Sequence, residues 1–233
     1  MSNAEDPLGW IDSQPRRPAP SRGAFHEQLD EVDSEIVAVA TIVAELIRPV
    51  TAAFLAGDRP AAAAALTADA EVDQRCERLE EQCFELLARQ SPVAGDLRRL
   101  VAALRAAADV DRSAELLGHV AESLSWVHPP SMRPALREMV GQMGGVTADV
   151  FAGAVAAWRD TDALAAVDLQ RLDDQVDLLQ KTVLTELYLG GQTVEEAVSL
   201  ALICRYYERI ADHAVELARL VTYVVTGERP EEG

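Results

Sequence analysis

Hydrophobic residues recur every three or four positions through most of this chain, which is the period of an amphipathic α-helix. The pattern begins near Phe25 and is broken at five places where glycine, proline, serine, aspartate or threonine cluster. The segments between the breaks predict six long helices, at 24–56, 59–89, 93–127, 132–157, 161–189 and 193–226. Three breaks supply side chains that suit the N-cap of the next helix: Asp58, Ser91 and Thr193. The connections are short, which favours antiparallel neighbours, so we expect an all-α protein.

The break at Pro129–Pro130 divides the six helices into two sets of three. We therefore expect two pseudo-symmetric three-helix bundles, at 24–128 and 131–226. Residues 1–23 contain four prolines and show no helical period, so we expect a disordered N-terminal tail, and we assign 227–233 to a C-terminal tail.

The two predicted bundles share an acidic pattern on their second and third helices, with two carboxylates four residues apart on each helix. Residues so spaced lie one above the other on a single helix face. The second helix of each bundle has the pattern DxxVD, and the third has two acids flanking an arginine and two small or apolar residues. The eight acids are Asp69, Asp73, Asp111 and Glu115 in the first half, and Asp173, Asp177, Glu208 and Asp212 in the second.

The spacing of these pairs fits two helical hairpins. Asp73 to Asp111 spans 38 residues, and Asp177 to Glu208 spans 31. The difference of seven removes about one helical turn from each arm, which keeps the same faces opposed. A change of length that preserves the pairing indicates a duplicated site.

Several carboxylates gathered in a partly dry space repel one another unless they take up protons or cations. Asp111 and Glu115 continue an apolar stripe, so we expect them to replace core residues, whereas Glu208 and Asp212 share a strip with small residues that leave room. Oxygen-only ligands suit Mg²⁺, Ca²⁺, Mn²⁺ or iron, so we predict a metal site in each half. The alternative is a solvated acidic face that pairs with Arg112 and Arg209.

Composition limits the class of protein. The net charge of −18 disfavours nucleic-acid binding, and 49% hydrophobic residues with only 5% aromatics suit a globular helical protein. No apolar run approaches the roughly 18 residues of a membrane span, and the N-terminus does not resemble a signal peptide. The three cysteines, Cys76, Cys83 and Cys204, form no disulfide framework. We expect a soluble cytoplasmic protein with reduced thiols and no membrane insertion.

Several blocks resemble the PhoU family of phosphate-signalling regulators, and its actinobacterial PhoY members in particular. They are FHEQLDEV near Phe25, PVAGDLR from Pro92, DVDR from Asp109 and YERIADHAVELA from Tyr206, followed by VTG. The resemblance covers Phe25 to about Gly227 and implies two pseudo-symmetric bundles, each with an E(D)xxxD motif at which some members bind metal. By position these motifs are Asp111 with Glu115 and Glu208 with Asp212, and Asp96 and Asp109 also match acidic family positions. The first repeat reads DRSAE where the family often has ERIGD, which weakens the expectation of a metal at the first site.

The resemblance implies a non-enzymatic negative regulator of the phosphate-starvation response. Such a protein links the ATPase of a phosphate ABC transporter to a sensor histidine kinase, and exposed bundle edges are compatible with a homodimer. Two other classes stay open. A carboxylate-bridged di-iron enzyme needs Glu-x-x-His motifs, which His119 and His213 do not supply, so we read both as surface or interface residues. A metal-free helical scaffold would use the same acids to bind a basic partner.

Overall fold

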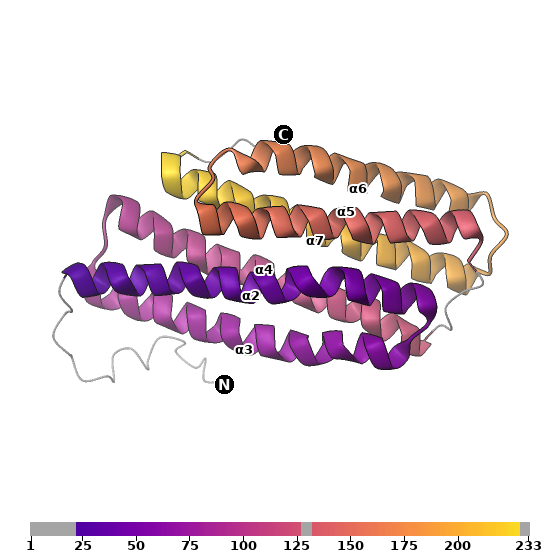
Figure 1. Ribbon diagram of the computed structural model, residues 1–233, viewed down its shortest axis with the longest axis horizontal. Helices are drawn as coiled ribbons and strands as arrows, with labels where there is room; N and C mark the ends of the chain where they lie inside the picture. Colours follow the sequence, from indigo (N-terminus) through magenta and orange to yellow (C-terminus); the bar gives the residue numbers. More distant parts are fainter. Residues whose placement is uncertain (1–21, 127–131, 229–233) are drawn as a thin grey trace, which may run out of the picture.

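The computed structural model describes residues 22–126 and 132–228, and in these ranges the chain is helical with no strand (Figure 1). The six helices are α2 (Arg22–Ala56), α3 (Arg59–Gln90), α4 (Ala94–Trp126), α5 (Pro134–Asp160), α6 (Ala165–Tyr188) and α7 (Val194–Thr226). The predicted all-α class is confirmed. The predicted break at 128–131 and most of the predicted tails lie outside the described residues, although Arg22 and Gly23 belong to α2.

Capping side chains explain where several helices begin. The Asp58 side chain accepts a hydrogen bond from the backbone N–H of Ala61, and Thr193 forms a capping box with Glu196, as the sequence predicts. The prediction for Ser91 is wrong, because this residue ends α3 in a left-handed conformation with φ of 45°. The next helix begins only after Pro92, which disfavours a helical conformation in the residue before it.

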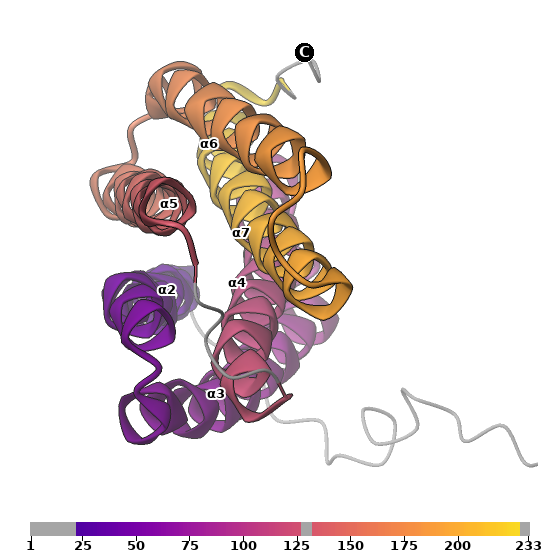
Figure 2. The same ribbon diagram turned by 90° about the vertical axis from the view of Figure 1, so that its right-hand side faces the viewer.

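The helices lie nearly along one axis and pack in two groups of three (Figures 1 and 2). All three pairs within α2, α3 and α4 are in contact, and so are all three pairs within α5, α6 and α7. The groups meet through α2 against α5 and α4 against α7, and one continuous apolar core runs through both. The limits proposed for two bundles, 24–128 and 131–226, stay a prediction, since the boundary between them is outside the described residues.

Thr51 of α2 contacts both α5 and α7 inside this core. The hydroxyl groups of Thr51 and Tyr207 are 2.7 Å apart and buried. Gly144 faces the same threonine, and a Cβ built on it would lie 2.3 Å from Thr51 Oγ1. A side chain at position 144 would therefore push α5 away from α2.

Among the described residues α2 is the one helix whose length and composition would allow it to cross a membrane. The expectation that no apolar run approaches the length of a membrane span is therefore wrong for α2. Its buried residues recur at three- and four-residue spacing, and α2 contacts α3, α4 and α5. The apolar character of α2 thus suits a helix that packs against three others.

The three cysteines are buried and unbridged. Burial raises the pKa of each thiol to about 12, which keeps the thiols protonated and unreactive. They therefore belong to the core.

Candidate metal centre

The first acidic cluster lies between α3 and α4. Asp69 and Asp73 come from α3, and Asp111 and Glu115 come from α4, in the antiparallel arrangement that the spacing predicts. Burial raises the pKa of Asp69, and the charges of Glu115 and Asp73 raise it further. Burial also raises the pKa of Asp111, with Asp73 as the largest repelling charge. The four carboxylates therefore lie within reach of one another's charge.

Two basic side chains lie beside this cluster. Arg112 pairs with Glu115 at 2.5 Å, and His119 Nε2 lies 3.9 Å from the same carboxylate. Gly118 of α4 faces Asp69, and a Cβ built on it would lie in ordinary contact with Asp69 Oδ2, at 3.6 Å. The pairing with Arg112 that belongs to the alternative of a solvated acidic face is thus present, and the first cluster is partly neutralised.

Asp111 and Glu115 do not replace core residues, contrary to the sequence-based expectation. Both are half-buried, whereas the buried positions around them on α4 are Val110, Ala114 and Leu117. The apolar stripe of α4 runs through the residues directly before these two acids. The acids therefore lie about 100° around the helix from the centre of the stripe. They lie at the edge of the contact between α3 and α4.

The second acidic cluster lies between α6 and α7 and is more enclosed. Asp173 of α6 is 7% exposed, and Glu208 of α7 is 8% exposed. Asp177 is partly buried, and Asp212 is exposed. The strip of small residues on α7 therefore buries Glu208 as expected but leaves Asp212 at the solvent edge.

The pKa values in the second cluster reflect burial and mutual repulsion. Burial, followed by the charge of Asp212 and then that of Asp177, raises the pKa of Asp173 from 3.8 to about 6. Burial and the charge of Asp212 raise the pKa of Glu208, and burial raises the pKa of Asp212. Three of the four carboxyl groups are thus harder to ionise than in solution.

Only some oxygens of this cluster have hydrogen-bond donors. The Gln170 amide donates to Asp173 Oδ2 at 3.1 Å, Arg205 pairs with one oxygen of Glu208, and Lys181 lies 3.3 Å from Asp177. Asp173 Oδ1 and Glu208 Oε2 are buried without a hydrogen-bond partner. Buried carboxylate oxygens without donors are unfavourable unless a proton or a cation binds them.

Within the described ranges, no three histidine, cysteine, aspartate or glutamate side chains are arranged so that they could hold a metal ion. The clusters therefore supply suitable ligand chemistry without a finished coordination shell. The two buried, unpartnered oxygens of Asp173 and Glu208 are the atoms in these clusters that would gain most from a proton or a hard cation. The first cluster fits less well, because Glu115 already pairs with Arg112.

Sequence reasoning missed two contacts of the acidic helices. Arg205, not Arg209, forms the ion pair with Glu208, and the i,i+3 spacing of this pair could have indicated it. No local pattern indicates the contact between His213 Nδ1 and Asp109 Oδ1, which are 2.9 Å apart. This contact joins α7 to α4. His213 directly follows Asp212 in the sequence, and Asp109 lies two residues before Asp111.

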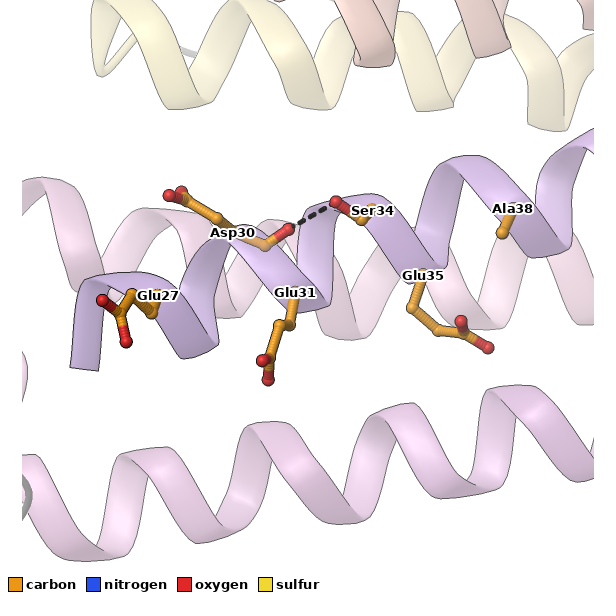
Figure 3. A pocket seen from close by; sticks show the side chains of 6 residues that line it. All are labelled: Glu27, Asp30, Glu31, Ser34, Glu35 and Ala38. Carbon is orange, nitrogen blue, oxygen red and sulfur yellow. Dashed lines mark hydrogen bonds between the residues drawn. The ribbon is translucent and has the colours of Figure 1, made fainter. Parts of the chain in front are cut away.

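A third acidic surface lies on α2, lined by Glu27, Asp30, Glu31 and Glu35 around a hollow of about 640 Å³. Figure 3 shows Glu31 and Glu35 on one side of α2 and Asp30 on the other. Arg75 of α3 holds Glu35 at 2.7 Å, and Arg99 of α4 lies 2.7 Å from Asp30. These pairs fasten α2 to its neighbours, which gives this surface a structural role.

Comparison with known proteins supports the duplication. The family model described as PhoU domain matches the chain twice, over residues 36–124 and 140–221. The phosphate-specific transport system accessory protein PhoU homolog 1 of Mycobacterium leprae is 34% identical over 214 residues, covering 91% of this chain and 96% of the relative. PhoU homolog 2 of Mycobacterium tuberculosis is 34% identical over 212 residues, covering 90% of this chain and all of the relative.

Solved structures are similar as well. The crystal structure of PhoU from Pseudomonas aeruginosa superimposes with a TM-score of 0.82 at 26% identity, covering 88% of this chain and 100% of that one. The phosphate transport system regulatory protein PhoU of Streptococcus pneumoniae gives a TM-score of 0.80 at 20% identity, covering 89% of this chain. At that identity the second likeness concerns the fold alone.

Proposed function

The chain belongs to the PhoU family, and from this membership we propose that it is an accessory protein of a phosphate-specific transport system. Its relatives from Mycobacterium have that function in their names and match this chain over nine-tenths of its length. In this role the protein is a non-enzymatic adaptor in the cytoplasm. It represses the phosphate-starvation response while phosphate is plentiful.

The partners proposed for the adaptor are the ATPase of the phosphate ABC transporter and a sensor histidine kinase. The six long helices of the described ranges present extended side-chain surfaces, which suits docking of a partner. Neither histidine near the clusters supplies a Glu-x-x-His pair, since His119 follows Glu115 by four positions and His213 binds Asp109. These features disfavour the di-iron enzyme.

The observation that supports a metal-linked adaptor most is the pair of buried, unpartnered oxygens in the second cluster. Asp173 and Glu208 would hold the cation, with Asp177 and Asp212 beside them at the solvent edge. A bound ion, whether Mg²⁺, Ca²⁺, Mn²⁺ or iron, would neutralise these carboxylates and hold α6 against α7. The ion would thereby set the shape of the surface that the partner meets.

A metal-free scaffold is the second candidate, and the first cluster favours it. Glu115 is already paired with Arg112, and the acids there are only half-buried. Such a surface can remain hydrated and attract basic side chains of a partner. The two halves would then differ in function, with a cation in the second and a bare acidic face in the first.

Deletion of the gene tests the adaptor role. In a strain that also lacks any paralogue, we expect phosphate-starvation genes to be expressed in phosphate-rich medium, and the wild-type gene should restore repression. Co-purification from phosphate-rich cells should recover the transporter ATPase or the kinase. Unchanged repression in the deletion strain would contradict the proposal.

A further inference from the structure

An apolar groove of about 520 Å³ lies between the C-terminal half of α4 and the N-terminal half of α7. His119 and Ser123 form its α4 wall, and its other lining residues come from α7. Buried Ile203 belongs to the lining, and the rings of His119 and Tyr206 meet across the helices with centroids 5.6 Å apart. The size suits several apolar side chains at once.

The wall on α7 exposes large hydrophobic residues to solvent. Val194, Val198 and Leu202 follow one another at four-residue spacing and are 82%, 54% and 43% exposed. Residues so spaced form one ridge along a helix. A hydrophobic ridge beside a groove matches the way in which an amphipathic helix of a partner inserts its apolar face.

The rim of the groove is acidic. Glu195 lines it on α7. On α4, Glu122 lies 3.5 Å and Glu115 lies 3.9 Å from the His119 ring that forms the wall. The charge at the rim has the same sign as the net charge of −18. A helix that enters this groove therefore needs positive charge on its outer face.

The charge argues against two other occupants. A second copy of this chain would place one acidic rim against another. In the N-terminal segment the apolar residues Leu8 to Ile11 have acids as their nearest charged neighbours, Asp6 before them and Asp12 after them, whereas Arg16 and Arg17 come later in the chain. The groove and its rim favour a different protein.

We propose that this groove between α4 and α7 is the docking site for a cationic amphipathic helix of a partner protein. The helix would lay apolar side chains on Val198 and Leu202 and direct lysine or arginine towards Glu195. This inference deepens the adaptor role proposed above, because it assigns a docking surface and the chemistry of the segment that fits it.

The test uses a fluorescent synthetic peptide of about five helical turns, with leucine along one face and lysine on the other. An isomer of the same composition, with leucine spread evenly around the helix, controls for charge attraction. Binding to the full chain is followed by fluorescence anisotropy. The variants are the double substitution Val198→Ser with Leu202→Gln, the rim substitution Glu195→Gln, and Val167→Ser on α6 as a matched exposed valine, 60% exposed.

We expect the amphipathic peptide to bind the wild type and its isomer to bind about tenfold more weakly or not at all. The double substitution should weaken binding about tenfold or more, whereas Val167→Ser should leave it unchanged. Glu195→Gln should reduce both the affinity and its dependence on salt. Circular dichroism melting of each variant would show that folding is retained.

Equal binding of both peptides, or an unchanged affinity in the double variant, would overturn the proposal. So would a wild-type dimer in sedimentation that the double substitution converts to a monomer, because a second copy would then occupy the groove. The titration contains no transporter or kinase. A failed titration would therefore contradict the docking groove and not the adaptor role. Unchanged gene expression after deletion would contradict the adaptor role and not the docking groove.

Discussion

Replacing Asp173 by asparagine should stabilise the protein at neutral pH when no metal is present. The ionised carboxylate is 7% exposed, lies near Asp177 and Asp212, and leaves one buried oxygen without a donor. Asparagine keeps the shape and an oxygen that can accept from Gln170, and it removes the charge. The substitution thus isolates the repulsion that the proposed cation would relieve.

The magnitude follows from the pKa of Asp173, which rises from 3.8 to about 6 on folding. Each pKa unit corresponds to ~1.36 kcal/mol, so ionised Asp173 destabilises the folded state by about 3 kcal/mol as an upper bound. Solvent at the edge of the cluster screens part of this, which leaves about 1–2 kcal/mol. For a chain of this length that is roughly 3–6 °C in the melting temperature.

The sign of the pH dependence is set by the raised pKa. The folded state binds the proton more tightly than the unfolded state, so this contribution weakens the fold as the pH rises from about 4 to about 6. The advantage of Asp173→Asn should therefore be full at pH 7 and about half as large at pH 5. It should approach zero near pH 3.

Thermal and urea unfolding of chelator-treated protein at pH 7 and pH 5 would measure this difference. Asp149→Asn is the control, since Asp149 is exposed and paired with Arg48 at 2.6 Å, an ion pair expected to contribute little. If Asp173→Asn were no more stable than the wild type at pH 7, or if its advantage were the same at both pH values, the electrostatic reasoning would be wrong.

Three further tests, each by thermal or urea unfolding, concern the core and the cap of α7. Gly144→Ala should destabilise the protein by about 1–3 kcal/mol, because the added Cβ would meet Thr51. The neighbouring Gly145→Ala should be neutral or stabilise the protein by up to about 1 kcal/mol. Equal effects of the two substitutions would contradict the close approach of α5 to α2. Tyr207→Phe should cost about 1 kcal/mol through loss of the buried hydrogen bond to Thr51, and an unchanged free energy of unfolding would count against that bond. Thr193→Ala should lower the free energy of unfolding by about 1 kcal/mol, because it removes the cap of α7. Thr193→Ser should retain most of the wild-type stability, since serine can also accept the capping hydrogen bond. A serine variant as unstable as the alanine variant would count against the cap.

The sequence was sufficient to predict the helices and the pairing of acids across each hairpin. The apolar period, Asp58 and Thr193 determine where helices run and begin, and these are local properties. Ser91 was misassigned because Pro92 and the left-handed end of α3 determine that turn together. The depth of each acid could not be predicted, since it depends on the rotation of one helix against another.

That rotation explains why the four-residue pairs differ between the halves. Asp111 and Glu115 lie one residue away from the buried stripe of α4, whereas Glu208 lies in the strip that faces α6. The contact between His213 and Asp109 was equally out of reach, because it joins residues 104 positions apart across the two helix groups. Such contacts arise from tertiary packing and have no local pattern.

Equilibrium dialysis of chelator-stripped protein against Mn²⁺ tests the central claim most directly. We expect saturable binding by the wild type, and loss of the binding assigned to the second cluster when Asp173→Asn and Glu208→Gln are combined. The first-cluster pair Asp111→Asn and Glu115→Gln should change it less. If the wild type bound no Mn²⁺ saturably, neither cluster would be a cation site. If the second-cluster variant bound Mn²⁺ as well as the wild type does, the second cluster would not be the cation site.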